Sequence, residues 1–363
     1  MKVFTDCHKD IRPGYPLERF APLNDILFID IETTGLSKEH TSLYLVGCGY
    51  FDDEGYNTIQ WFADTPGEEA LILSESVSYI DGHFGTLIHY NGKRFDIPYL
   101  SYKASLYGIK DPFSSLCDHD IYRMIKPFGK LMGLSSMRQR SIEQLLDIVS
   151  DDPYTGRELI GVYHEYVHTG DPSLVAPLIY HNSEDLKGMA YILPILHYTA
   201  LKYIRLDYVS HSIHDYTDYA GNRKQEILAV YSHDTDIPKP ITARYDDVIL
   251  KINNDKTALI RIPVINTELK HFYADYRNYY YLPAEDKCIH RSAASGVDPS
   301  RRENAKKETC YIKHSGLFIP AVTDSDILFR SEYSSKRSYI PFNEDMITGT
   351  LKDIGDKIIS QTF

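Results

Sequence analysis

The feature that most constrains the fold is a strongly apolar stretch, ILFIDIETTG at residues 26–35, that contains two acidic residues. Its Ile, Leu and Phe predict a buried β-strand. Because side chains two apart in a strand face the same side, Asp30 and Glu32 point together while Ile31 faces the opposite layer. Two buried carboxylates repel each other unless something positive compensates, and Mg²⁺ takes oxygen ligands of this kind. The segment therefore predicts a core strand that presents a divalent-cation site.

The first part of the chain alternates between strand and helix patterns. Short apolar runs predict strands at residues 26–31, 44–50, 58–62 and 86–90. Helical spacing of apolar residues predicts helices at residues 68–80, 98–107, 141–148, 157–168 and 174–196. This alternation is typical of an α/β domain.

After about residue 203 the pattern changes to short strands, such as 248–252 and 258–264, joined by a polar turn. The 363 residues are enough for two domains. We predict an N-terminal extension at residues 1–19, an α/β domain at residues 20–202, and a β-rich C-terminal domain of unknown role at residues 203–363.

The net charge of −12 is unevenly distributed. Residues 1–200 hold 16 basic and 28 acidic side chains, whereas the rest of the chain holds 23 of each. An acidic part suits a site that collects divalent cations, although an ordinary acidic surface fits the same totals. No apolar run approaches the ~20 residues of a membrane span, and five scattered cysteines do not suggest a disulfide framework. We therefore expect a cytoplasmic protein with no membrane association.

Two later segments also combine polar side chains with apolar surroundings. In HYNGKRFDIPYL, a predicted strand leads through a turn to Asp96 at the start of a helix, where the carboxylate is either a site residue or a helix cap. In PLIYHNSEDLKGM, His181 and Asp185 are four residues apart and share one helical face.

The three segments DIETTG, NGKRFD and HNSED resemble, in this order, the motifs of the DEDD superfamily of 3′–5′ exonucleases. More narrowly, DIETTGL…YLVG, YNGKRFDIP and HNSEDL look like the YprB-like group of ribonuclease H-like proteins, over about residues 20–200. The resemblance implies a ribonuclease H-like fold, with a mixed five-stranded sheet and flanking helices. It also implies that two Mg²⁺ or Mn²⁺ ions, which activate water and stabilise the leaving oxygen, are held by four acids: Asp30, Glu32, Asp96 and Asp185.

The third motif departs from the family pattern. Family members carry a Tyr four positions, or a His five positions, before the last acid, whereas this chain has His181 at four and Tyr180 at five. Four helical residues advance by about 400°, which returns His181 to the face of Asp185. We therefore predict that His181 orients or deprotonates the attacking water. A structural His paired with a nearby acid is the alternative.

Other residues are candidates for substrate contact. Beside the acids, we expect contacts from Thr33, Asn91 and Lys93. In the second domain, a Tyr-rich run precedes a basic segment, a combination that suits single-stranded nucleic acid, and its candidates are Arg301, Arg302, Lys306 and Lys307. A packed strand followed by a solvated basic surface is the alternative.

Together with these observations, the resemblance implies a two-metal, 3′–5′ exonuclease-like hydrolase, which we expect to act on ends of single-stranded DNA or RNA. One alternative is a catalytically weak nucleic-acid-binding or scaffolding protein that keeps the fold, and another is a structure-selective endonuclease. A zinc site is not favoured, because the spacing of its candidate ligands does not fit the common sites; these candidates are Cys288, His290, Cys310 and His314.

Overall fold

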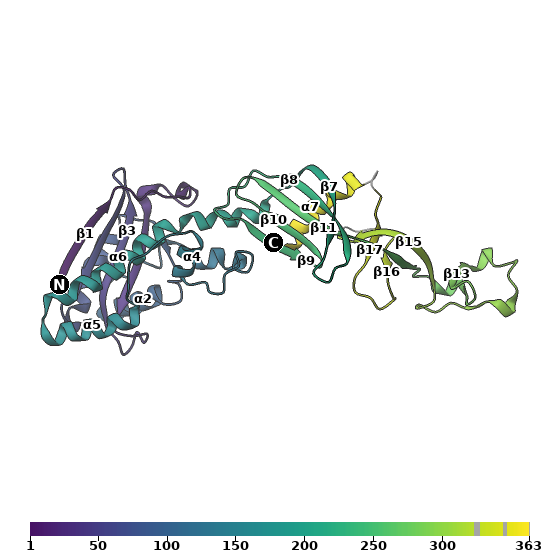
Figure 1. Ribbon diagram of the computed structural model, residues 1–363. Coiled ribbons are helices and arrows are strands. Elements are labelled where there is room, and N and C mark those ends of the chain that lie inside the picture. Colours follow the sequence, from purple (N-terminus) through teal and green to yellow (C-terminus); the bar gives the residue numbers. More distant parts are fainter. Residues whose placement is uncertain (323–326, 344–346, 363) are drawn as a thin grey trace. The chain divides into compact units, whose positions relative to one another are not determined.

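The computed structural model describes residues 1–322, 327–343 and 347–362. Contacts divide the chain into two compact units (Figure 1). The first comprises Met1–Ala200 and Ile237–Lys239, and the second comprises Leu201–Asp236 and Pro240–Phe363. Each unit has a sheet of its own.

The first unit is built on a six-stranded mixed sheet, in the order β1-β4-β3-β2-β5-β6. Its strands are β1 (Lys2–His8), β2 (Ile26–Thr33), β3 (Leu43–Phe51), β4 (Tyr56–Phe62), β5 (Thr86–His89) and β6 (Cys117–Asp120). The strands β1 to β4 pair antiparallel, whereas β5 is parallel to β2 and β6 is parallel to β5. The predicted mixed sheet is confirmed, but the count of five strands is wrong because β1 adds to the free edge of β4. Residues 1–19 are therefore part of this unit rather than an extension.

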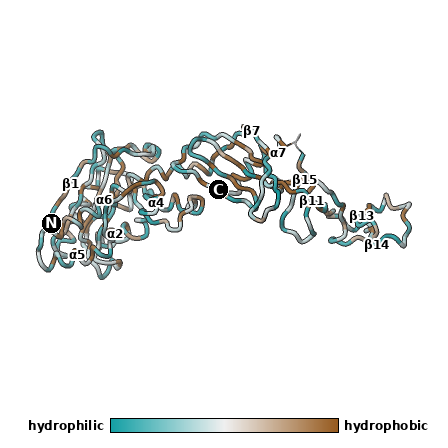
Figure 2. The backbone as a smooth tube through the Cα atoms, viewed as in Figure 1, coloured by the Kyte–Doolittle hydropathy of each residue, from teal (hydrophilic) through white to brown (hydrophobic). Residues whose placement is uncertain are grey.

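Helices cover both faces of this sheet. They are α1 (Glu69–Ile80), α2 (Asp96–Tyr107), α3 (Ile121–Ile125), α4 (Gln139–Leu145), α5 (Gly156–Thr169) and α6 (Val175–Tyr191), followed by the 3₁₀ segment η6 (Leu193–Tyr203). One core lies between the sheet and α1 with α2, and another lies between the sheet and α5 with α6. Figure 1 shows α6 crossing the sheet, and Figure 2 shows hydrophobic residues recurring along the strands.

Residues at the two ends of α5, the helix that precedes α6, determine where this helix begins and ends. The Thr155 hydroxyl accepts from the Glu158 backbone N–H, and the Glu158 carboxylate accepts from the Thr155 N–H, which together form a capping box. The helix ends at Thr169 and is capped by Gly170, whose φ of 68° is the left-handed conformation that glycine adopts without strain. A short 3₁₀ turn, Pro172–Leu174, then leads into α6.

The second unit is rich in strands, as expected. Its larger sheet contains β7 (Asp207–Thr217), β8 (Arg223–Ser232), β9 (Ile241–Tyr245), β10 (Val248–Ile252), β11 (Thr257–Phe272), β15 (Tyr311–Pro320), β16 (Phe329–Arg330) and β17 (Tyr339–Pro341). The long strand β11 organises this sheet: its first half pairs with β8 and β10, and its second half pairs with β15. The helix α7 (Ile347–Thr362) packs against β7 and β9.

A small three-stranded sheet projects from the same unit. It contains β12 (Tyr279–Leu282), β13 (Lys287–His290) and β14 (Glu303–Asn304). All five cysteines of the chain are free, as the sequence predicts. Within the described residues, no helix combines the length and apolar character needed to cross a bilayer.

Candidate active site

Three elements of the first unit bring the predicted residues together. Strand β2 carries Asp30 and Glu32, and its parallel neighbour β5 leads into α2, whose first residue is Asp96. The carboxyl ends of parallel neighbours meet at one edge of a sheet, so these acids converge. Helix α6 packs over β2, β3 and β4 and presents His181 and Asp185. Phe95, not Asp96, occupies the N-cap position of α2 and makes no side-chain cap, so the capping alternative for Asp96 is wrong.

His181 lies at the centre of the carboxylates. Its Nδ1 is 2.5 Å from Asp152 Oδ2, and its Nε2 is 3.6 Å from Glu32 Oε1 and 3.7 Å from Asp185 Oδ2. Ligand atoms of Glu32, His181 and Asp185 lie within 4.8 Å of one another. Among the described residues, this is the group of His, Cys, Asp and Glu side chains that is close enough to hold a metal ion.

The contact with Asp152 determines which ring nitrogen of His181 carries the hydrogen. An ionised carboxylate only accepts hydrogen bonds, so Nδ1 carries the hydrogen and the neutral ring has its free lone pair on Nε2, facing Glu32 and Asp185. Burial lowers the pKa of His181, but the charges of Glu32, Asp185 and Asp152 outweigh it, and the pKa is raised. Tyr180 is 40% exposed and its ring lies 5.8 Å from Lys187 Nζ, so the structure brings His181, not Tyr180, to the acids.

A second residue of α6 anchors Asp30. The fully buried Asn182 donates from Nδ2 to Asp30 Oδ2 at 2.7 Å, and its Oδ1 accepts from Gln60 Nε2 at 2.8 Å. Strand β3 makes room for this amide at Gly47, which pairs with Asp30 in the sheet. A Cβ atom at Gly47 would lie 2.0 Å from Asn182 Oδ1. The glycine therefore permits the close approach of α6 to the sheet.

The electrostatics of the cluster favour proton or cation binding. Burial, assisted by Asp185, Asp96 and Glu32, raises the pKa of Asp30 well above its usual value. Burial raises the pKa of Glu32 to about 8, against the opposing charge of His181. It also raises the pKa of Asp96 to about 7, although backbone hydrogen bonds at Asp96 and Ile31 oppose it.

The Asp185 side chain is 41% exposed, against 11% for that of Glu32. Burial raises the pKa of Asp185 to about 6, with His181 lowering it and Glu143 and Asp152 raising it. The four acids together offer only oxygen donors, which is the donor type that Mg²⁺ and Mn²⁺ take. The side chains therefore fit the divalent ions that the sequence predicts.

The loop residues expected to contact substrate are largely engaged within the protein. The Thr33 hydroxyl donates to the Gly35 carbonyl at 2.7 Å. Lys93 Nζ donates to Asp118 Oδ2 at 2.8 Å. Asn91 has a left-handed φ of 60°, and its backbone N–H donates to Asp120 Oδ1. Of these three side chains, that of Asn91 is the one that forms no hydrogen bond with the described residues.

Sequence reasoning missed two residues that complete the site. Asp152 is 4% exposed and lies in the loop before α5, and Asn182 is the neighbour of His181 on α6. The only sequence signal for Asp152 is an acidic pair, Asp151 and Asp152, just before a capped helix. Nothing in the sequence indicates which carboxylate reaches His181, because 29 residues separate the two.

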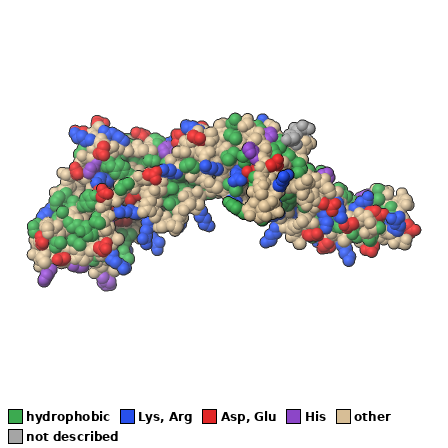
Figure 3. Space-filling model, in the orientation of Figure 1, with side chains coloured by type: hydrophobic (Ala, Val, Ile, Leu, Met, Phe, Trp, Pro, Cys, Tyr) green, Lys and Arg blue, Asp and Glu red, His purple; other side chains and the backbone are tan. Residues whose placement is uncertain are grey.

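The residues of the basic segment predicted to bind nucleic acid make different contacts. Arg301 pairs with Glu285 at 2.8 Å, and Arg302 lies 4.6 Å from the ring of Tyr280. Lys307 lines a cavity near the end of β11. On the face drawn in Figure 3, acidic and basic side chains are mixed along this unit.

The tyrosines ahead of that segment mainly form a small core. This core contains Cys288, Ala305 and Cys310, packed by Tyr273, Tyr276, Tyr279 and Tyr281. The packed-strand alternative thus describes these four tyrosines, and both cysteines are buried among aromatic rings.

Comparisons with known proteins agree with the first unit's architecture. The family model of the RNase H superfamily matches residues 27–196. The fold of this region is therefore ribonuclease H-like. A search of curated proteins finds no match.

Solved structures of exonuclease I and of a family B DNA polymerase show partial similarity to the chain. An exonuclease I structure, described in terms of its processivity, is 13% identical with a TM-score of 0.34, covering 57% of this chain and 55% of its own. The zinc-bound E. coli exonuclease I complex with single-stranded DNA is 14% identical, with a TM-score of 0.30 and coverage of 57% and 54%. The family B DNA polymerase from Pyrobaculum calidifontis is 10% identical, with a TM-score of 0.36 and coverage of 71% and 36%. The chain thus spans just over half of the length of exonuclease I. With TM-scores of 0.30 to 0.36, these similarities support no conclusion about function.

Proposed function

We propose that the first unit is a divalent-metal-dependent, 3′–5′ exonuclease-like hydrolase that acts on ends of single-stranded nucleic acid. The observation that carries the proposal is the convergence of acids from β2, α2 and α6 around a buried histidine. Within a ribonuclease H-like domain, this arrangement suits hydrolysis of a phosphodiester bond. The residues that would hold two Mg²⁺ or Mn²⁺ ions are Asp30, Glu32, Asp96 and Asp185.

When bound, such ions supply Lewis acidity at phosphorus and stabilise the leaving oxygen. The protein's own part in the reaction is proton transfer and positioning. Hydrolysis forms a bond between a water oxygen and phosphorus, and it breaks the bond from phosphorus to the 3′ oxygen, which takes up a proton and becomes the 3′ hydroxyl of the shortened strand. His181 Nε2 is the site that would accept the proton from the water, because Asp152 holds Nδ1 in its protonated form. Asn182 keeps the Asp30 carboxylate in one orientation.

The test is degradation of single-stranded DNA and RNA, each labelled at one end, with Mg²⁺, with Mn²⁺ and with EDTA. The proposal predicts loss of the 3′ label first, stepwise shortening of 5′-labelled strands, and no cleavage in EDTA. An Asp30→Asn variant controls for contaminating nucleases. Cleavage that is independent of added metal, or equal in the variant, would contradict the proposal.

The alternatives give different results in the same assay. A structure-selective endonuclease would cut circular single-stranded DNA, which the proposed exonuclease leaves intact because it has no end. A binding protein that keeps the fold would retain the labelled strands without shortening them.

A further inference from the structure

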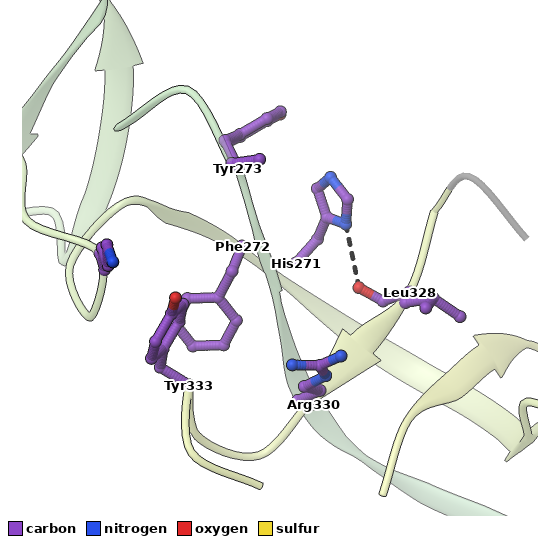
Figure 4. Close-up of a pocket in the computed structure, with 8 residues that line it drawn as sticks. His271, Phe272, Tyr273, Leu328, Arg330 and Tyr333 are labelled. Carbon is purple, nitrogen blue, oxygen red and sulfur yellow. Dashed lines mark hydrogen bonds between the residues drawn. The ribbon is translucent and has the colours of Figure 1, made fainter. Parts of the chain in front are cut away.

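A cavity of about 440 Å³ lies in the second unit, far along the chain from the acids (Figure 4). It is within the size range of small-molecule sites, roughly 300–1,000 Å³. The end of β11, the strand β16 and the turn after it supply most of its wall. The lining residues are His271, Phe272, Tyr273, Ala274, Lys307, Leu328, Arg330 and Tyr333.

The cavity wall is positively charged and includes no carboxylate, in a chain with 51 acidic residues. Arg330 donates from Nε to Ser338 Oγ at 3.0 Å, which orients its guanidinium without a counter-charge and leaves the Nη donors available among the described residues. Lys307 is exposed and makes no ion pair within the part of the chain that the structure describes. The nearby Glu332 is paired with Lys270 at 3.1 Å. Two cationic side chains in the wall of one cavity, Arg330 and Lys307, with no carboxylate in that wall, suit a phosphate group.

Aromatic rings form the rest of the wall. Figure 4 shows Tyr333 beside Phe272, and their rings are edge to face with centroids 5.6 Å apart. Tyr333 is 39% exposed, so part of its ring surface is open to a ligand. His271 Nδ1 donates to the Leu328 carbonyl at 3.0 Å, so Nε2 of the neutral ring is left as the acceptor and has no hydrogen-bond partner among the described residues. A flat heteroaromatic group suits such a wall.

We propose that this cavity binds one nucleotide unit of a single-stranded nucleic acid, with the phosphate held by Arg330 and Lys307 and the base against Tyr333. Stacking on aromatic rings combined with phosphate contact is how proteins hold single strands without reading their sequence. The inference rests on the proposed function for the identity of its ligand, but its evidence lies wholly in the second unit. It assigns the phosphate contact to Arg330 and Lys307 instead of Arg301 and Arg302. The side chain of Arg301 pairs with Glu285, and that of Arg302 lies over the ring of Tyr280.

The test is fluorescence anisotropy of labelled oligothymidylate and oligouridylate with the full-length chain in EDTA, so that no cleavage occurs. Arg330→Gln is compared with Arg244→Gln, an exposed residue of β9 outside the cavity. Tyr333→Leu is compared with Tyr216→Leu, since Tyr216 on β7 is 40% exposed. Each cavity variant should weaken binding about 5-fold or more, as expected for loss of one stacked base or phosphate contact. The control variants should bind like the parent.

A neighbouring pair of lysines gives a second comparison in case Arg330→Gln does not fold. Lys306 and Lys307 are both exposed, but only Lys307 lines the cavity. Lys307→Gln should reduce the log–log salt slope by about 0.7 for a single strand, and Lys306→Gln should leave it closer to the parent value. Thermal unfolding of every variant verifies that it is folded.

Competition identifies the source of the nucleotide. Displacement of the oligomer by a nucleoside monophosphate, lost in Arg330→Gln, indicates a site for free nucleotides, whereas no displacement indicates a site for a strand. Inorganic phosphate alone tests whether the phosphate contact suffices. The proposal is overturned if neither oligomer binds the parent, or if folded cavity variants bind as tightly as their controls. Cleavage is not a readout here, so failure of the nuclease assay and failure of this test are distinguishable.

Discussion

The Asp30 carboxylate is oriented by a neutral amide, which provides direction without cancelling its charge. Asn182 donates one hydrogen bond to it, while burial and the neighbouring acids raise its pKa. An ionised Asp30 in this buried position lowers the stability of the folded protein unless a proton or a cation is bound. The proposed cation site therefore explains the position of Asp30 on the interior strand β2 better than protein stability does.

Replacing Asp30 by Asn should abolish Mg²⁺- or Mn²⁺-dependent cleavage and leave the metal-free protein equally or more stable. The amide oxygen of Asn still accepts from Asn182, and the substitution relieves repulsion with Glu32. End-labelled cleavage and thermal unfolding in EDTA measure the two effects. Asp151→Asn, at an exposed position outside the cluster, is the control. Full activity in Asp30→Asn would rule out its role.

The contacts of His181 predict a graded series. His181→Ala should lower kcat by about 10²-fold or more, as expected for loss of a proton-transfer group, with KM nearly unchanged. Asp152→Asn should lower kcat by a smaller factor, because the ring keeps its place but no longer has Nδ1 held protonated. Tyr180→Phe should be mild, since Tyr180 lies away from the acids.

Steady-state kinetics of the three variants, with thermal unfolding as the folding control, measures this series. Equal loss of activity in Tyr180→Phe and His181→Ala would contradict the assignment. So would a change in KM alone in Asp152→Asn, because a residue that positions His181 acts on the chemical step.

The periodicity of the sequence was sufficient to place His181 beside Asp185, because one helix carries both. Helical geometry is local, so four-residue spacing fixes which side chains share a face. Asp152 reaches His181 through a loop with no period, and the Asn182 contact depends on the distance between a helix and a sheet. Contacts of this kind depend on tertiary packing, which the sequence pattern does not encode at the level of single residues.

At the scale of elements, the approach of α6 to the sheet depends on Gly47 in β3. Gly47→Ala should destabilise the protein by about 1–3 kcal/mol, the usual cost of overpacking, because the new Cβ atom meets Asn182. It should also reduce cleavage, since α6 carries both His181 and Asp185. Gly161→Ala is the matched control: this glycine is exposed in α5 and has open space around it, so the change should stabilise by roughly 0.5–1 kcal/mol.

Chemical denaturation of both variants measures the difference. An unchanged free energy of unfolding in Gly47→Ala would mean that Asn182 can move aside without cost, and that the Asp30 contact is not held by this packing.

The elements with strong periodicity were predicted within a few residues of their observed bounds, as for β2, β3 and α1. Strand β1 was missed because its sequence, KVFTDCH, is half polar and mostly exposed at a sheet edge. In the second unit, Arg330 and Tyr333 lie about 60 residues after Phe272, and only the pairing of β11 with β16 brings them together. Sheet partners distant in sequence leave no periodic signal.

At the scale of the whole molecule, charge and chemistry are divided between the two units. The acid excess lies in the first 200 residues with the carboxylate cluster, whereas the cavity lined by Arg330 and Lys307 lies in the second unit, whose part of the chain is balanced in charge. An acidic catalytic unit repels a polyanion unless cations are bound. Under the proposed function, the carboxylate cluster thus cleaves the nucleic acid and the cavity of the second unit binds it.

The stability of the metal-free protein should depend on pH with a sign set by the cluster. The pKa of Glu32 is raised from 4.5 to about 8, that of Asp96 from 3.8 to about 7, and that of Asp185 from 3.8 to about 6. At pH values between the ordinary pKa and the raised pKa of each group, the folded state binds more protons than the unfolded state. The free energy of unfolding therefore falls as pH rises. The raised pKa of His181 acts in the same direction above its usual value of 6.5.

We therefore expect the Tm in EDTA to fall as pH rises from about 5 to about 8. Excess Mg²⁺ or Mn²⁺ should reduce or reverse this fall, because binding to the ionised carboxylates favours the folded state most at high pH. Asp30→Asn should flatten the profile in EDTA, since it removes one repelling charge. Asp64, whose pKa is lowered from 3.8 to about 2 by hydrogen bonds with Lys2 and Tyr166 that outweigh its burial, contributes stability that is lost only below this window. A Tm in EDTA that is constant or rises between these pH values, in a chain shown to be free of metal, would mean that the four acids are not coupled in the folded protein and that the cation site must be assigned elsewhere.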